Sequence, residues 1–78
     1  MFNVLDTVVL QRDVPEAGLQ AGDLGAIVES YGTGAYEVEF VAASGRTQAL
    51  ITLRASDLRA VADNDLVAVR SVPQRAAG

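Results

Sequence analysis

The chain contains no cysteine, no histidine, no lysine and no tryptophan. Without cysteine no disulfide can form, and without cysteine or histidine the usual ligands of zinc and iron–sulfur sites are missing. Nucleophilic and general-base catalysis draw mainly on those two residue types and on lysine. These absences predict a protein that is not an enzyme and that holds no metal ion or other cofactor.

Basic charge is also scarce, because six arginines stand against ten acidic residues and leave a net charge of −4. Binding to phosphate backbones needs a basic surface, so nucleic acid is not the expected partner. No apolar run approaches the roughly 20 residues that cross a bilayer, and the first residues lack the basic start of a secretory signal. We therefore expect a cytoplasmic protein with no membrane partner, and no pattern indicates a small-molecule substrate.

The length of 78 residues corresponds to one domain near the lower limit for a self-sufficient core. A domain of this size buries only about 60% of its unfolded surface, so it is marginal unless it is cross-linked or associated. Half of the residues are hydrophobic. Good packing and self-association are therefore the remaining routes to stability.

Five short runs are typical of β-strands: residues 6–10, 24–30, 35–41, 47–53 and 58–61. The second and third runs are joined by a loop containing Gly32 and Gly34, which is a strong hairpin signal. Alternation is clearest in the third run, where Tyr36, Val38 and Phe40 share one face. We expect that face to line the core.

The connections between these runs indicate a known order of elements. Residues 11–21 predict a long loop without a helix, because Pro15 keeps Val14 out of the helical region, with Val14 and Leu19 folded into the core. Gly25 predicts a bulge or a close backbone approach, and residues 55–58 predict a single 3₁₀ turn. The sequence thus predicts an all-β fold, a small five-stranded SH3-like barrel over residues 1–61.

A C-terminal extension follows over residues 62–78. Its residues 66–72 are again β-branched and apolar, Pro73 ends this run, and residues 74–78 are expected to be a disordered tail. The apolar run exceeds what five strands require. Two interpretations remain open, one in which it adds a strand to its own sheet and one in which it pairs with another chain.

Five blocks of the sequence together resemble a family. They are residues 5–10 (LDTVVL), 13–19 (DVPEAGL), 21–25 (AGDLG), 34–40 (GAYEVEF) and 55–59 (ASDLR). In this order they are similar to an uncharacterised group of short bacterial proteins, domain of unknown function 4926, over roughly residues 4 to 60. The resemblance implies an SH3-like barrel and supplies no activity.

A second and shorter resemblance concerns the turn Asp23-Leu-Gly25, which looks like the KOW motif of ribosomal and transcription-factor barrels. It implies a nucleic-acid-binding barrel as an alternative function. The basic residues that such barrels use are missing nearby, where Asp23 and Glu29 stand instead.

Several residues are candidates for a site. Glu37 and Glu39, with Glu29 across the hairpin, could hold a hard cation, but we interpret them as a solvated face opposite arginines such as Arg54. Exposed or loop residues that could contact a partner are Asp13, Glu16, Tyr31, Leu66, Val67 and Val69.

These observations favour a small non-catalytic protein-interaction module whose partner the sequence does not identify. The partner could be a second copy of the chain or the product of a neighbouring gene, in which case the chain would be antitoxin-like or an accessory subunit of an enzyme. The KOW-like nucleic-acid-binding barrel stays open as the alternative.

Overall fold

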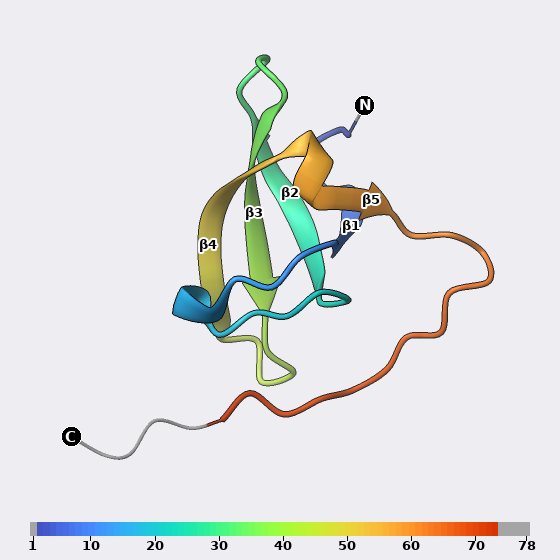
Figure 1. The fold of residues 1–78 in the computed structure, drawn as a ribbon. Coiled ribbons are helices and arrows are strands. Elements are labelled where there is room, and N and C mark those ends of the chain that lie inside the picture. The colour runs from blue at the N-terminus through green and yellow to red at the C-terminus, as the bar shows by residue number, and fades with distance from the viewer. Residues whose placement is uncertain (1, 74–78) are drawn as a thin grey trace.

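Five antiparallel strands in one sheet make up the fold, in the order β4-β3-β2-β1-β5. The structure is a computed structural model that describes residues 2–73. Figure 1 shows β2, β3 and β4 running side by side, with β1 and β5 beyond β2. The all-β prediction with five strands is confirmed. The strands are β1 (Thr7–Leu10), β2 (Leu24–Ser30), β3 (Ala35–Val41), β4 (Thr47–Arg54) and β5 (Leu58–Ala60).

Strand β3 carries the alternation that organises the core. Tyr36, Val38 and Phe40 are buried, with Val38 fully inaccessible to solvent, so the predicted inward face is confirmed. Phe2 packs edge-on against the Tyr36 ring at a centroid distance of 5.5 Å. The buried cluster draws on all five strands and on the long loop: Val8, Leu10, Val14, Leu19, Ile27, Tyr36, Val38, Phe40, Leu53 and Leu58.

The long loop between β1 and β2 folds back on the core as expected. Val14 and Leu19 are buried and pair with each other in an isolated antiparallel bridge. Between them Pro15–Ala17 forms a 3₁₀ turn, η1, in addition to the expected turn η2 at Ala55–Asp57. The prediction of a single 3₁₀ turn is therefore wrong, because Pro15, which excludes α-helix, has a φ suited to the first position of such a turn.

The two edges of the sheet are β4 and β5, and no ladder joins them within residues 2–73. The turn η2 links the edges along the chain, and the Asp57 Oδ2 accepts a hydrogen bond of 3.0 Å from the Arg54 N–H. Closure into a barrel stays a prediction. No helix in this part of the chain is long and apolar enough to cross a membrane.

The extension forms no strand over residues 61–73. It leaves β5, swings away from the strands at the right of Figure 1 and returns beneath them. The interpretation that it adds a strand to its own sheet is not realised in the described part of the chain. The expected disordered tail at 74–78 lies outside the described residues.

Gly25 in β2 lies against the buried side chains of Val38 and Phe40. A Cβ built on this glycine would stand 2.7 Å from the Val38 Cγ1 and 2.9 Å from the Phe40 Cε1. The sequence predicted a bulge or a close backbone approach here; the atoms that approach Gly25 closely belong to side chains, and the irregularity of register in β2 occurs further along, between Ile27 and Glu29. Only glycine fits opposite these buried side chains.

The substitution Gly25→Ala should therefore destabilise the fold. The added methyl group forces Val38 or Phe40 off its packed position, which we expect to cost about 1–3 kcal/mol of unfolding free energy. Urea denaturation measures this loss, with Ser30→Ala at the exposed end of β2 as the control, expected within about 0.5 kcal/mol of the wild type. Equal stability of Gly25→Ala and the wild type would contradict the close approach.

Candidate functional site

The extension is tied to the sheet first at Asp65, just after β5. Its two carboxylate oxygens accept hydrogen bonds from Arg59 Nη1 at 2.8 Å and Arg59 Nη2 at 3.1 Å. The same side chain also accepts a hydrogen bond of 2.7 Å from the Ala62 N–H, which closes a tight turn. The hydrogen bond from Arg59 holds the pKa of Asp65 below its usual value of 3.8. This first anchor fixes where the extension begins.

A second anchor lies five residues further on, at Arg70. Its Nε donates to the Asp23 Oδ1 at 2.8 Å, and its Nη2 donates both to the Asp23 Oδ2 and to the Gly18 carbonyl oxygen, the latter at 3.1 Å. A guanidinium that binds a carboxylate through two nitrogens fixes orientation as well as distance. Arg70 thereby ties the extension to the turn before β2 and to the long loop.

Asp23 is suited to this role because its carboxylate accepts hydrogen bonds from two different donors, Arg70 and the Gln20 N–H. Partial burial pushes the pKa of this carboxyl upward, but the hydrogen bonds from Arg70 and from the Gln20 N–H outweigh burial, so the pKa lies below the usual 3.8. The side chain therefore stays ionised at neutral pH. Its charge is then available to hold Arg70.

Between the two anchors, residues 66–69 present aliphatic side chains to solvent. Leu66 is 94% exposed, Val67 73% and Val69 97%. No backbone hydrogen bond from residues 66–73 to another segment occurs within the described part of the chain. The side chains of this apolar, β-branched segment are therefore not buried by the described part of the protein. Its backbone forms no hydrogen bond with the sheet there.

The extension and the strands beneath it line a groove. Val9, Leu24 and Val41 line it on the side of the strands, and residues 65–73 line it on the side of the extension. Val9 is only 5% exposed although it lies on the opposite face of β1 from the core residues Val8 and Leu10. The groove therefore shields apolar surface that lies outside the main core.

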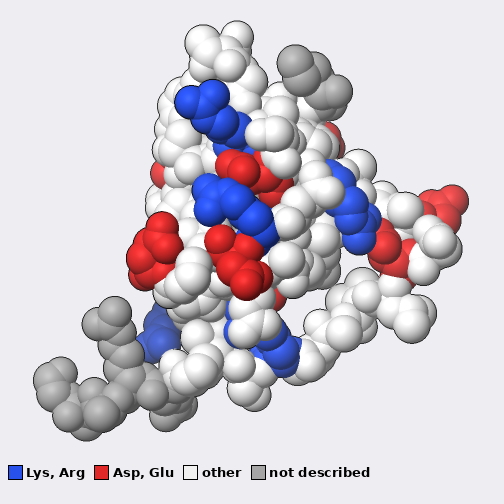
Figure 2. Space-filling view, viewed as in Figure 1, with Lys and Arg blue, Asp and Glu red and all other residues white. Residues whose placement is uncertain are grey.

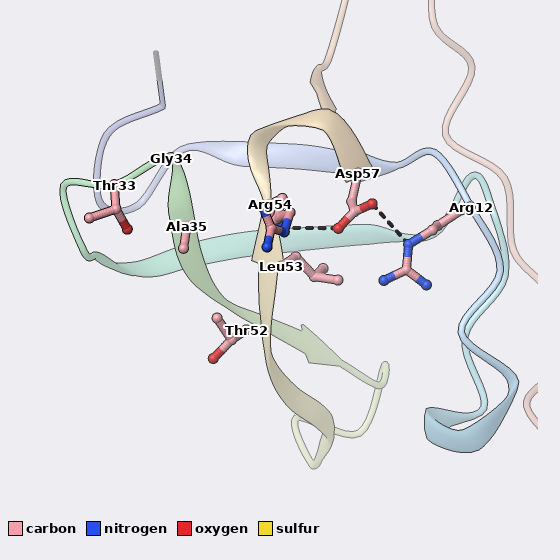
Figure 3. Close-up of a pocket in the computed structure, with 8 residues that line it drawn as sticks. All are labelled: Arg12, Thr33, Gly34, Ala35, Thr52, Leu53, Arg54 and Asp57. Atoms are coloured by element: carbon pink, nitrogen blue, oxygen red, sulfur yellow. Dashed lines mark hydrogen bonds and ion pairs between the residues drawn. The ribbon is translucent and has the colours of Figure 1, made fainter.

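A separate hollow lies near the tip of the β2–β3 hairpin and shares no lining residue with the groove. Figure 3 shows Asp57 between Arg12 and Arg54 there: its Oδ1 accepts a hydrogen bond of 2.8 Å from the Arg12 Nε, and its Oδ2 accepts one from the Arg54 N–H. The bond from Arg12 lowers the pKa of Asp57. Asp57 thus joins the long loop to the η2 corner and has a structural role.

Charge on the face seen in Figure 2 does not gather into a patch of one sign. Arginine and acidic side chains alternate down this face. Three ion pairs account for three of the five arginines among residues 2–73, with Arg12, Arg59 and Arg70 bound to Asp57, Asp65 and Asp23. The visible surface offers no extended basic tract.

The candidate residues in the long loop and at the hairpin are dispersed. The Asp13 Oδ1 accepts a hydrogen bond of 2.9 Å from the Ala21 N–H and so braces the loop, whereas Glu16 is exposed on η1 at the rim of the groove. Tyr31 is exposed, and its hydroxyl donates to the Glu37 Oε1 at 3.2 Å. Partial desolvation and this carboxylate raise the pKa of Tyr31.

The glutamates on the outer face of the hairpin have different partners from those expected. Glu29 does lie opposite Glu37 across the hairpin, as predicted. Glu37 and Glu39, however, accept hydrogen bonds of 2.6 Å from the hydroxyls of Thr52 and Thr47, and Arg54 faces Ala35. The prediction of arginine partners is wrong, because the register places Thr52 opposite Glu37 and Leu50 opposite Glu39, and the Thr47 hydroxyl reaches Glu39 from the start of β4. No group of three or more potential metal ligands occurs among residues 2–73.

Sequence reasoning identified Leu66, Val67 and Val69 but missed the residues that present them. The first anchor pairs Arg59 with Asp65, which are 6 positions apart along the chain. The second pairs Arg70 with Asp23, which are 47 positions apart. The one available signal was Arg70, the single charge in the apolar run of residues 66–72. Its distant partner could not be read from that run.

Comparison with known proteins gives one result. The family model described as Domain of unknown function (DUF4926) matches residues 4–60, which include all five strands and both 3₁₀ turns. Neither a curated protein nor a solved structure matches the chain. The extension lies beyond the matched residues.

The three arginine–aspartate ion pairs predict that the protein loses stability in acid. Because the pKa values of Asp23, Asp57 and Asp65 are lowered in the folded protein, their ionised forms favour folding at neutral pH. This contribution is complete above the unfolded value of about 4 and is lost as the pH falls through the lower folded values. Urea denaturation between about pH 7 and about pH 2 should show unfolding free energy falling below about pH 4.

Asp23→Asn isolates the second anchor in the same experiment. It should lower stability at neutral pH and reduce the further loss on acidification, because the ionised partner of Arg70 is already gone. Asp63→Asn, at an exposed position with no ion pair in the described chain, is the matched control. An Asp23→Asn profile parallel to that of the wild type would contradict a role for this anchor.

Proposed function

The chain belongs to the DUF4926 family, and because that membership assigns no activity, we propose its function from the geometry. It is a small non-catalytic protein-interaction module, and it docks a protein partner through the apolar segment of its extension, residues 66–69. We include in this proposal that the five-stranded sheet is an SH3-like barrel that serves as a rigid base. The order of a long loop, two hairpins, a 3₁₀ turn and a short last strand supports this fold assignment.

One observation carries the proposal: three large aliphatic side chains stand in solvent on a segment that two arginine–aspartate pairs hold in place. Leu66, Val67 and Val69 gain nothing for the stability of the chain while they are exposed. Large aliphatic groups exposed side by side on a small protein usually mark an interaction surface. The anchors at Arg59 and Arg70 limit the freedom of the segment before it binds, which lowers the entropic cost of docking.

The alternative of a KOW-like nucleic-acid-binding barrel has less support. The turn that resembles the motif contains Asp23, and the arginine nearest to it, Arg70, is already bound to that carboxylate. A net charge of −4 adds repulsion toward a phosphate backbone. A cytoplasmic protein partner, to which the chain would be an antitoxin-like companion or an accessory subunit, fits the module better.

Capture of partners from the native host by the immobilised protein tests this function. The wild type should retain a defined partner, which can be another copy of the chain. The triple substitution Leu66→Ser, Val67→Ser and Val69→Ser should weaken retention about tenfold or more, because it truncates the proposed contact residues. Its melting temperature should stay close to that of the wild type, since all three side chains are exposed.

The matched control is the double substitution Val4→Ser and Leu5→Ser, which truncates exposed aliphatic residues far from the extension in sequence. It should retain the partner like the wild type. If the triple variant captures the same proteins as the wild type and the control, residues 66–69 are not the docking segment.

A further inference from the structure

Strand β4 is an edge strand with a backbone that is bonded on one side only. It pairs with β3 over its whole length, and no other strand among residues 2–73 pairs with it. The start of the strand is covered, because the Gln48 Nε2 donates to the Ala17 carbonyl oxygen of η1 at 3.3 Å. From Ala49 onward the edge is open to pairing with another strand.

The hydrogen-bond pattern identifies which groups face that open edge. The Ala55 N–H donates to the Gly34 carbonyl oxygen at 2.9 Å, which makes these two a hydrogen-bonded pair. Bonded pairs recur at every second residue of an antiparallel ladder, so Leu53, Ile51 and Ala49 bond to β3. The backbone groups of Leu50 and Thr52 therefore point to the free edge.

Apolar surface lies on both faces of this open edge. Leu50 is on the outer face and is 52% exposed. Ala49 and Ile51 are on the inner face, where they pack against the core but remain partly accessible. A strand added here would need apolar side chains on both of its faces.

Residues 66–69 have that pattern. In an extended conformation Val67 and Val69 share one face, while Leu66 and Ala68 share the other. The flanking charges Asp65 and Arg70 are already paired with Arg59 and Asp23, so neither end brings an unpaired charge to the contact.

We propose that residues 66–69 of one copy add as a strand to the β4 edge of a second copy, at residues 49–52. This inference rests on the proposed function and names the partner. The same chain carries both halves of the contact, an unpaired apolar segment and an unpaired apolar edge. Both halves are uncharged, so two molecules of net charge −4 can meet there without placing like charges against each other.

The contact is intermolecular because the segment does not reach this part of its own edge. The groove beneath the extension is lined by Thr47 and Gln48 at the start of β4 but by none of residues 49–54. Arg70, bound to Asp23 and Gly18, keeps the segment on that side of the molecule. A second copy meets no such restriction.

Sedimentation velocity over a range of concentrations tests the contact with three matched lysine variants. Leu50→Lys places a charge on the acceptor edge, Val69→Lys places one on the donor segment, and Val4→Lys places one at a position of similar exposure to Leu50, away from both. The wild type and Val4→Lys should shift toward dimer mass with rising concentration. Leu50→Lys and Val69→Lys should need about tenfold higher concentration or more.

Mixing distinguishes a donor–acceptor contact from a merely adhesive patch. The Leu50→Lys protein keeps an intact donor, and the Val69→Lys protein keeps an intact acceptor. Their equimolar mixture should therefore form a dimer at concentrations where each alone is monomeric. If Leu50→Lys perturbs the fold by circular dichroism, Leu50→Pro replaces it, because the N–H that proline lacks at this position faces the free edge and is not bonded to β3.

Two results would overturn the inference: a wild type that stays monomeric at every concentration, or a Leu50→Lys protein that associates like the wild type. Either result leaves the interaction module itself intact if the triple serine variant still loses a different protein partner. If that variant loses no partner at all and the wild type is monomeric, both the module and the second copy as its partner are wrong.

Discussion

The inward burial of Tyr36, Val38 and Phe40 is the constraint on which the rest of the molecule depends. Because side chains alternate along a strand, burying these three sends Glu37 and Glu39 outward. The buried side chains of Val38 and Phe40 also occupy the space that a side chain at position 25 would need. The inward burial also fixes the register of β4, and with it the face on which Leu50 is exposed.

Apolar residues also lie outside the core, and the extension helps to shield one of them. Val9 lies on the wrong side of β1 for the core and is shielded instead beside the groove that residues 65–73 help to line. The Arg70–Asp23 pair holds the extension there, at the cost of leaving residues 66–69 exposed. The edge strand β4 is also open from Ala49 onward, because no strand within residues 2–73 pairs with its free side.

Features that depend on residues close together in the chain could be predicted from the sequence. The period of two in residues 35–41 and the glycines of the hairpin predicted the strands, and Pro15 correctly excluded an α-helix. What failed depended on register or on distant contacts. Arg54 was expected opposite the glutamates but lies opposite Ala35, and the pairing of Arg70 with Asp23 joins residues that no local pattern connects. The exposed segment was predictable, whereas the anchors that present it were not.

Amide hydrogen exchange at low and high protein concentration tests the central claim most directly, because it reports on backbone pairing residue by residue. In dilute solution the amides of Ile27 and Val38 should be protected, while those of residues 66–69, Leu50 and Thr52 should exchange rapidly. At high concentration the amides of Leu50 and Thr52 should become protected together with every second amide of residues 66–69, because alternate residues of an added strand bond to the edge. Strong protection of residues 66–69 in dilute monomer would show that the extension pairs within its own chain and would contradict the account.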